Sequence, residues 1–185
     1  MKVEFHRTGE RMYAIKILRD NLPDLEMNPA PGFDVLMPHD LCHFIVEQVL
    51  QIKQGIFGQI TKGGTAGSFR TLQNESAYSK NDSRQRRKNR QKGEKLVKQN
   101  LDDLARSERA TYICWQDWIS HSSDEKLKLK AAEMKENVVS IFAQLDGAER
   151  AIYTKERLAK VRLRMDQLSQ EWRHLKIGEA ISVDW

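Results

Sequence analysis

The chain has 185 residues, of which 39% are hydrophobic and 31% charged, and its formal net charge at pH 7 is +5. A chain of this length can bury a substantial core, and this composition excludes collagen-like, membrane-spanning and fully disordered proteins. The two cysteines, Cys42 and Cys114, are too few for a disulfide framework. Because the N-terminus has no apolar leader, we expect a protein of the reduced cytoplasm with no membrane partner.

The N-terminal residues have the pattern of a small antiparallel sheet. Apolar residues alternate with polar ones on both sides of a turn expected at Thr8-Gly9, and a short third strand is expected over 24–27. Residues 180–185 alternate in the same way, so we expect a C-terminal strand that can pair with the N-terminal hairpin. All four prolines lie between residues 23 and 38, which predicts an extended connection and then a helix from Pro38 to about Lys53.

Residues 96–176 have the apolar periodicity of helices. One stripe over 97–119 predicts a helix that ends near His121, and Ser122 followed by Glu125 predicts a capping box for the next. Heptad stripes over 127–145 and 158–175, joined by Asp146-Gly147, predict an antiparallel helical hairpin. Its second helix should have roughly 28 residues, a length that also suggests a homo-oligomer formed through the long helices.

Together these elements predict a single α+β domain, mostly α, in which a small N-terminal antiparallel sheet packs on a helical bundle. We expect the hairpin and the helix after it over 1–69, a basic flexible linker over 70–95, the helical region over 96–176 and the C-terminal strand over 177–185.

The positive charge is concentrated in one segment. Residues 80–98 contain nine Lys and Arg against two acids, whereas the rest of the chain has 22 bases and 24 acids. One interpretation is an arm that neutralises the phosphates of a nucleic acid, with contacts from Arg84, Arg86, Arg87, Lys88 and Arg90. The other interpretation is a solvated linker that leads into a helix.

One helix carries side chains that could do chemistry. The sequence His39-Asp40-Leu41-Cys42-His43 places two imidazoles about one turn apart, and Asp40 and Glu47 fall in the same quadrant of an otherwise apolar helix. Imidazoles with a carboxylate in reach are typical ligands of Zn²⁺, Mn²⁺ or Fe²⁺. We therefore predict a divalent metal site with His39, His43 and Glu47 as ligands. Asp40 would act as the catalytic base or orient an imidazole.

Other interpretations of this quadrant remain open. It could be a buried polar network with a structural role, or a solvated face, and a further ligand could come from His6, His121 or His174. If a metal binds, the site suits a hydrolase or lyase acting on an unknown small-molecule substrate. Protease chemistry is disfavoured because Asp40 is one methylene shorter than the general base of H-E-x-x-H enzymes. The alternative function is a non-enzymatic helical adaptor or scaffold whose basic arm binds nucleic acid.

Two resemblances accompany these residues. The segments Asn28-Pro29-Ala30-Pro31-Gly32-Phe33-Asp34, Pro38-His39-Asp40-Leu41-Cys42-His43-Phe44 and Gly55-Ile56-Phe57-Gly58-Gln59 resemble a bacterial family of short, uncharacterised proteins, which implies no activity. The His-Asp-x-x-His core is also similar to the zinc motif of a ubiquinone-biosynthesis protein family, in which a Glu follows twelve residues after the second His. Gly55 stands at that position here, so the resemblance does not supply a third ligand.

Overall fold

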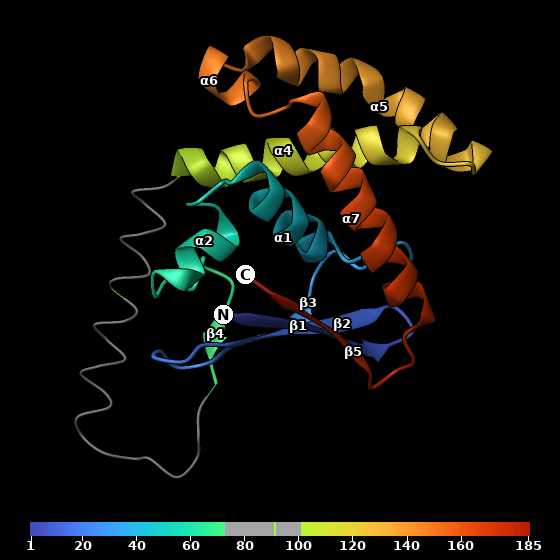
Figure 1. Ribbon diagram of the computed structural model, residues 1–185. Helices are drawn as coiled ribbons and strands as arrows, with labels where there is room; N and C mark the ends of the chain where they lie inside the picture. Colours follow the sequence, from blue (N-terminus) through green and yellow to red (C-terminus); the bar gives the residue numbers. More distant parts are fainter. Residues whose placement is uncertain (73–90, 92–100) are drawn as a thin grey trace, which may run out of the picture.

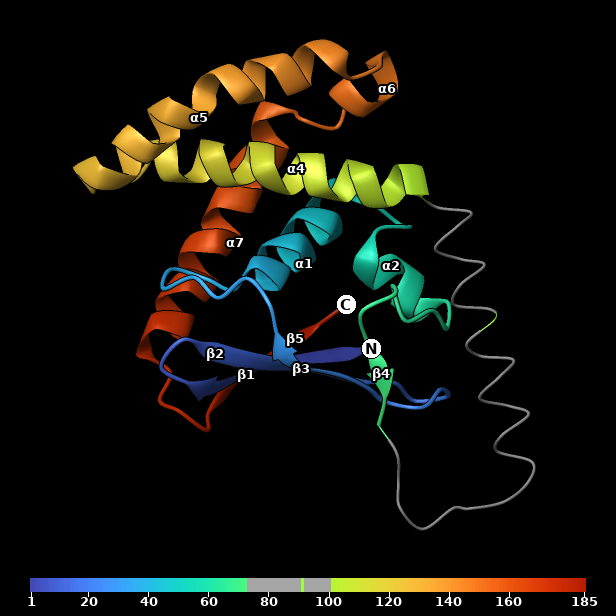
Figure 2. The same cartoon turned by 180° about the vertical axis from the view of Figure 1, so that it is seen from behind.

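The computed structural model describes residues 1–72, 91 and 101–185, and it combines an antiparallel sheet with a stack of helices (Figures 1 and 2). The strands are β1 (Lys2–Gly9), β2 (Met12–Leu18), β3 (Leu25–Ala30), β4 (Arg70–Thr71) and β5 (Ala180–Asp184). The helices are α1 (His39–Leu50), α2 (Ile56–Thr61), α4 (Leu101–Ser120), α5 (Glu125–Gln144), α6 (Gly147–Arg150) and α7 (Lys155–His174). This architecture confirms the predicted α+β fold. The strand β4 was not predicted, and it lies at the start of the segment 70–95 that was expected to be a flexible linker.

The sheet has the strand order β4-β3-β2-β1-β5, with every neighbouring pair antiparallel. The predicted hairpin and the C-terminal strand are confirmed, since Val3 of β1 pairs with Ile17 on one side and with Val183 on the other. This pairing brings the two ends of the chain together, and the N–H of Trp185 donates to the carbonyl oxygen of Met1 at 2.9 Å. The hairpin turn falls at Glu10-Arg11, two residues later than expected, because β1 continues through Gly9.

The helices cover one face of the sheet and leave the other face open (Figures 1 and 2). In β1 the side chains of Val3 and Phe5 are buried, whereas those of Lys2 and Glu4 on the opposite face are not. This alternation is typical of an antiparallel sheet with one solvated face. The core therefore lies between the sheet and the helices.

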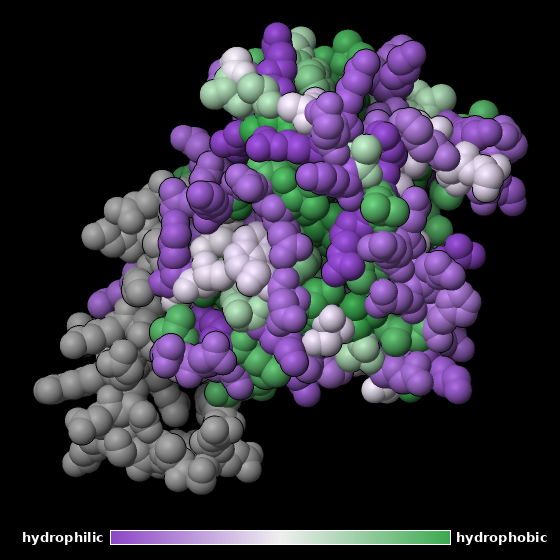
Figure 3. Space-filling view, in the orientation of Figure 1, coloured by the Kyte–Doolittle hydropathy of each residue, from purple (hydrophilic) through white to green (hydrophobic). Residues whose placement is uncertain are grey.

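Aromatic side chains join α1 and α7 to the sheet. Phe44 of α1 packs edge-on against Phe5, with ring centroids 6.4 Å apart, and Trp172 of α7 packs edge-on against Tyr13 at 6.1 Å. Helix α4 lies above α1 and α7, and α5 lies outermost (Figure 1). Accordingly α5 has a single buried residue, Ala131, and the face drawn in Figure 3 is mainly hydrophilic over the outer helices, with apolar side chains between them.

The helical hairpin is formed by a different pair of helices from the pair that the stripes predicted. Helices α4 and α5 run antiparallel and pack together, whereas α7 packs on α1 and α4. The apolar stripes of α5 and α7 do face the interior, as expected, but periodicity shows only that a helix has an apolar face and does not show which neighbour covers it.

The helix boundaries differ from expectation at two places where a side chain caps the backbone. Asp124, not Ser122, caps α5 by accepting a hydrogen bond from the N–H of Lys126. The expected 28-residue helix is divided into α6 and α7, because Thr154 caps α7 by accepting from the N–H of Arg157. Both residues are preferred N-cap types, which satisfy free N–H groups at a helix start.

The basic segment lies mostly outside the described residues. Residues 73–90 and 92–100 are not described, so the proposed nucleic-acid contacts of Arg84, Arg86, Arg87, Lys88 and Arg90 stay a prediction. At the start of the expected linker over 70–95, Arg70 and Thr71 form β4 and pair with β3. Of the helices in the described part of the chain, none is long and apolar enough to cross a membrane.

The packing of α7 on the sheet generates the first prediction. Trp172 is 1% exposed, and its Nε1–H donates to the carbonyl oxygen of Asp34 at 3.2 Å. The substitution Trp172→Ala should lower the free energy of unfolding by about 3–5 kcal/mol, because it leaves a large cavity in the core. On the same helix Leu163 is 61% exposed, so Leu163→Ala should change it by less than about 0.5 kcal/mol. Urea denaturation of both variants checks this, and equal effects would contradict the described packing.

Candidate metal centre

The loop before α1 places the first histidine. The N–H of His39 donates to the carbonyl oxygen of Gly32 at 3.1 Å, and Gly32 has φ +76°, a conformation that favours glycine. A Cβ atom at Gly32 would lie 2.8 Å from the Cβ of His39. His43 follows one turn later, and the two rings are edge to face with centroids 4.6 Å apart. The sequence prediction of paired imidazoles is therefore confirmed.

The carboxylate that joins the two histidines comes from α4. His39 Nε2 and His43 Nε2 are 3.0 Å apart, and Glu108 Oε2 lies 3.8 Å from the first and 3.4 Å from the second. Among the described residues, this is the group of histidine, cysteine and acidic side chains that has the geometry to hold a metal ion.

The dimensions of this triangle match a metal site. Three atoms at separations of 3.0, 3.4 and 3.8 Å lie about 2.0 Å from a common point, which is the usual bond length of zinc to imidazole nitrogen and carboxylate oxygen. We refer to His39, His43 and Glu108 as the His-His-Glu cluster.

The His-His-Glu cluster lies at the boundary between the core and the surface. The side chain of His43 is 1% exposed, whereas those of His39 and Glu108 are 53% and 62% exposed. One imidazole of the cluster is therefore enclosed by the core, and the other two side chains face a cavity that opens to solvent.

Hydrogen bonds behind His43 determine its tautomer. The Ser107 hydroxyl donates to Glu47 Oε1 at 2.6 Å, so its oxygen is free to accept a hydrogen bond from His43 Nδ1, 2.9 Å away. Thr111 Oγ1 lies 3.1 Å from the same nitrogen. With the proton on Nδ1, the lone pair of His43 Nε2 points into the cluster. Such a chain from a metal-binding histidine to a carboxylate is common in metal sites.

Glu47, the expected third ligand, lies behind the cluster rather than in it. Its side chain is 0% exposed, and its two oxygens accept hydrogen bonds from the N–H groups of Ile56 (2.7 Å) and Phe57 (3.0 Å) as well as from Ser107. Burial raises the pKa of Glu47, and these hydrogen bonds oppose the increase. The carboxylate thus holds the first turn of α2, and Glu108 takes its expected place.

Asp40 also differs from expectation. Its carboxylate Oδ2 accepts a hydrogen bond from the Tyr13 hydroxyl, and it orients neither imidazole. Burial raises the pKa of Asp40, and the Tyr13 hydrogen bond opposes this. The role expected of Asp40, orienting an imidazole, falls instead to Glu47 through Ser107. A buried polar network, one of the two alternatives for this quadrant, therefore describes both acids.

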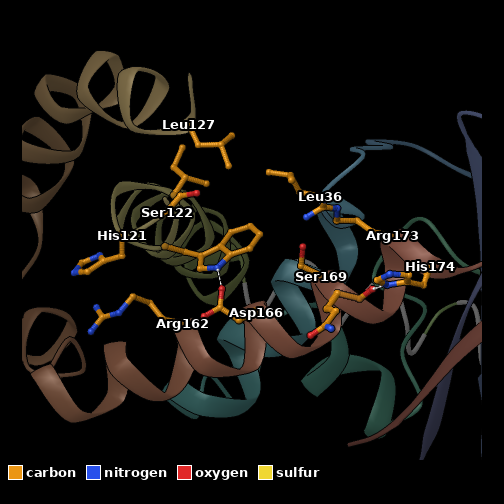
Figure 4. Close-up of a pocket in the computed structure, with 12 residues that line it drawn as sticks. Leu36, His121, Ser122, Leu127, Arg162, Asp166, Ser169, Arg173 and His174 are labelled. Carbon is orange, nitrogen blue, oxygen red and sulfur yellow. Dashed lines mark hydrogen bonds between the residues drawn. The ribbon is translucent and has the colours of Figure 1, made fainter. Parts of the chain in front are cut away.

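The remaining histidines do not supply a further ligand in the described structure. His121 and His174 line a second cavity of about 620 Å³ between α4 and α7, where they lie at opposite ends (Figure 4). Each donates from Nδ1 at 2.7 Å to the backbone carbonyl four residues earlier, that of Asp117 and Gln170 respectively. His6 lies on the sheet, with its Nε2 3.0 Å from Glu4.

Without a metal, a proton can hold the His-His-Glu cluster together. The nearby Glu108 carboxylate raises the pKa of His39, and the neighbouring imidazoles, His39 first, hold the pKa of Glu108 well below its usual range. A protonated His39 can donate from Nε2 toward His43 Nε2 and the Glu108 carboxylate. A metal ion would take the position of that proton.

Comparisons with known proteins add no assignment. No family model matches the chain, and no match is found among curated proteins or among solved structures. The chemistry of the cluster is therefore argued from its geometry.

Sequence reasoning missed Glu108 and Ser107, although α4 contains a signal for both. Glu108 falls four residues after Leu104 and four before Tyr112, so a charged residue interrupts the expected apolar stripe. The buried face of α4 is offset from that stripe and includes Ser107, Thr111 and Cys114. Small polar residues on a buried helix face usually have hydrogen-bond partners inside the protein.

The buried Glu47 carboxylate generates a stability prediction. Glu47→Ala should lower the free energy of unfolding by about 3 kcal/mol or more, because three donors from α2 and α4 would lose their acceptor. Glu133 is exposed on α5, so Glu133→Ala should change it by less than about 0.5 kcal/mol. Thermal or urea denaturation measures both.

A second variant tests the same interaction from the other side. A Cβ atom at Gly55 would lie 2.3 Å from Glu47 Oε1, so Gly55→Ala should destabilise the protein by displacing the carboxylate. If both Glu47→Ala and Gly55→Ala are as stable as the Glu133→Ala control, the carboxylate does not hold α2 in solution.

Proposed function

We propose that this protein binds one divalent metal ion through His39, His43 and Glu108. The observation that supports this best is that Nε2 of both histidines and Oε2 of Glu108 lie about 2.0 Å from a common point, the length of a zinc–ligand bond. Two histidines with one carboxylate occur in catalytic zinc sites and in non-haem iron(II) sites. Zn²⁺, Fe²⁺ and Mn²⁺ are the candidates.

The arrangement favours a catalytic over a purely structural metal. Structural zinc sites are usually closed by four protein ligands, whereas three protein ligands leave a position open for water or substrate. A metal bound here would lower the pKa of such a water or polarise a substrate oxygen. We propose a metal-dependent enzyme of the hydrolase or lyase type, in which the exposed side of His39 and Glu108 admits the substrate.

The surrounding residues have distinct parts in this proposal. Glu47 and Ser107 hold His43 in the tautomer that presents Nε2 to the metal. Tyr13 binds the Asp40 carboxylate, so the catalytic base expected at Asp40 is not favoured by this geometry. Gly32 anchors the start of α1 and with it His39.

Metal binding can be tested directly. The untagged protein should bind one Zn²⁺ per chain, as measured by elemental analysis after dialysis and by calorimetry. His39→Ala and Glu108→Ala should each weaken zinc binding about 100-fold or more, since removing even an outer partner of a ligand costs about 10- to 100-fold. His121→Ala removes a histidine outside the cluster and should leave the affinity unchanged. The proposal is wrong if the two cluster variants bind zinc as tightly as His121→Ala.

The pKa shift of His39 predicts a pH dependence. Since the folded pKa of His39 is raised above the usual histidine value of about 6.5, zinc must displace a proton from His39 at any pH below that raised value. The apparent zinc affinity should fall about tenfold per pH unit there and become independent of His39 above it. Calorimetry in buffers of different ionisation enthalpy should detect close to one proton released per zinc at pH 6. An affinity that does not change between pH 5.5 and 6.5 contradicts this expectation.

The same groups affect the stability of the metal-free protein in a defined range. The pKa of His39 is raised, so its contribution is present below 6.5 and is lost as the pH rises through the folded value. The pKa of Glu108 is lowered from 4.5, so its contribution is lost as the pH falls through the folded value. The ion pair between His39 and Glu108 therefore stabilises the metal-free fold at pH values between the lowered pKa of Glu108 and the raised pKa of His39. The stabilisation is small, because both side chains are more than half exposed.

A further inference from the structure

Two members of the His-His-Glu cluster, His39 and Glu108, lie in the wall of a cavity of about 720 Å³. The cavity is bounded by the loop before α1, by α4 and by α5, and its volume is in the range of small-molecule sites. Its apolar and aromatic lining comprises Phe33, Met37, Tyr112, Trp115, Met134 and Ile141. A ligand that fills this cavity must therefore be largely apolar.

The cavity has two chemically different ends. Glu108, Tyr112 and Trp115 follow at spacings of four and three residues, so they share one face of α4. Seven residues of α-helix span about 10 Å. Glu108 of the His-His-Glu cluster lies at one end of this face, and Trp115 lies about 10 Å from it along the helix axis.

A lysine marks the far end. Nζ of Lys130 lies 5.7 Å from the centroid of the Trp115 ring. The side-chain amide of Gln116 donates to the carbonyl oxygen of Ala131 at 3.1 Å, which sets the first half of α5 against this part of α4. The ammonium group and the indole face thus form one corner of the cavity.

Lys130 is the cation in this wall that is free to bind a ligand. Arg109, which also lines the cavity, donates two hydrogen bonds to Glu149, at 3.1 and 2.8 Å. In the described part of the chain no carboxylate lies within ion-pair distance of Lys130. Asp34 accepts from the N–H of Leu36 within its own loop.

We propose that this cavity binds an elongated apolar carboxylate about 10 Å long. Its carboxylate pairs with Lys130, its apolar body packs on Trp115 and Met134, and an oxygen group at its other end reaches the metal. This inference rests on the metal site proposed above and adds the class of substrate: an acid that carries a second oxygen function, such as an amide or ester, at the end remote from its carboxylate.

Three hydroxamates test the inference on the zinc-loaded full chain. Acetohydroxamate probes the metal alone, octanohydroxamate adds an apolar chain, and suberic acid monohydroxamate adds a carboxylate at the far end of a chain of the same length. Affinities measured by calorimetry should increase in that order. The terminal carboxylate should add about fivefold, as expected for a partly exposed ion pair.

A matched pair of variants isolates the lysine. Lys130→Gln should abolish the advantage of suberic acid monohydroxamate over octanohydroxamate and leave zinc affinity unchanged. Lys128→Gln is the control, since Lys128 lies on the same helix, pairs with Glu125 at 2.7 Å and does not line the cavity. This control should keep the advantage.

The outcomes separate the two proposals. Failure of zinc to bind contradicts the metal centre, and the inference falls with it. If zinc binds but acetohydroxamate is as tight as the longer probes, the metal centre stands and the apolar cavity is not the substrate site. If the longer probes bind equally well, or if Lys130→Gln behaves like Lys128→Gln, Lys130 does not receive the carboxylate and the inference is wrong.

Discussion

The central interaction of this structure is the buried carboxylate of Glu47. Burying a charge is unfavourable unless hydrogen bonds replace its water, and here the replacements come from two other helices: two N–H groups of α2 and the Ser107 hydroxyl of α4. Three helices are thereby held at one point. Because Ser107 also accepts from His43, the interaction that stabilises the fold also determines which nitrogen of His43 faces the cluster.

Helix α4 can contribute to this point because its inner face is small. Ser107, Ala110, Thr111 and Cys114 are buried there, and small side chains allow helices to approach closely. Because α4 lies close to α1, the hydroxyls of Ser107 and Thr111 reach His43, and the longer Glu108 side chain reaches the cluster from the edge of α4. A leucine at position 107 would satisfy the apolar pattern better, but it could not accept the His43 proton.

The part of this structure that can be predicted from sequence is what depends on local spacing. Alternation finds the β1–β2 hairpin and β5, and helical periodicity places His39 and His43 one turn apart. Local spacing cannot assign Glu108, because 65 residues separate it from His43 and the intervening segment has no pattern that specifies a distance. For the same reason the apolar stripes of α5 and α7 predict an apolar face on each helix but not the neighbour that covers it, and the expected pairing of these two helices is wrong. Periodicity places Glu47 on the same helix quadrant as the histidines, but it does not show that α2 and α4 supply donors to both its oxygens.

The position of the cluster at the edge of the core is explained by the lone pair on His43 Nε2, which needs a partner. The Nδ1 proton of His43 is donated to Ser107, so its Nε2 carries a lone pair. Because this side chain is only 1% exposed, water cannot easily satisfy that lone pair, and it needs a hydrogen-bond donor or a cation. In the metal-free protein that partner is the Nε2–H of His39, 3.0 Å away, held by the nearby Glu108 carboxylate. A proton in this position satisfies one lone pair at a time, whereas a divalent cation satisfies both imidazoles and the carboxylate together. The exposed halves of His39 and Glu108 would let such an ion enter without unfolding the core, and the buried His43 would give it a fixed ligand.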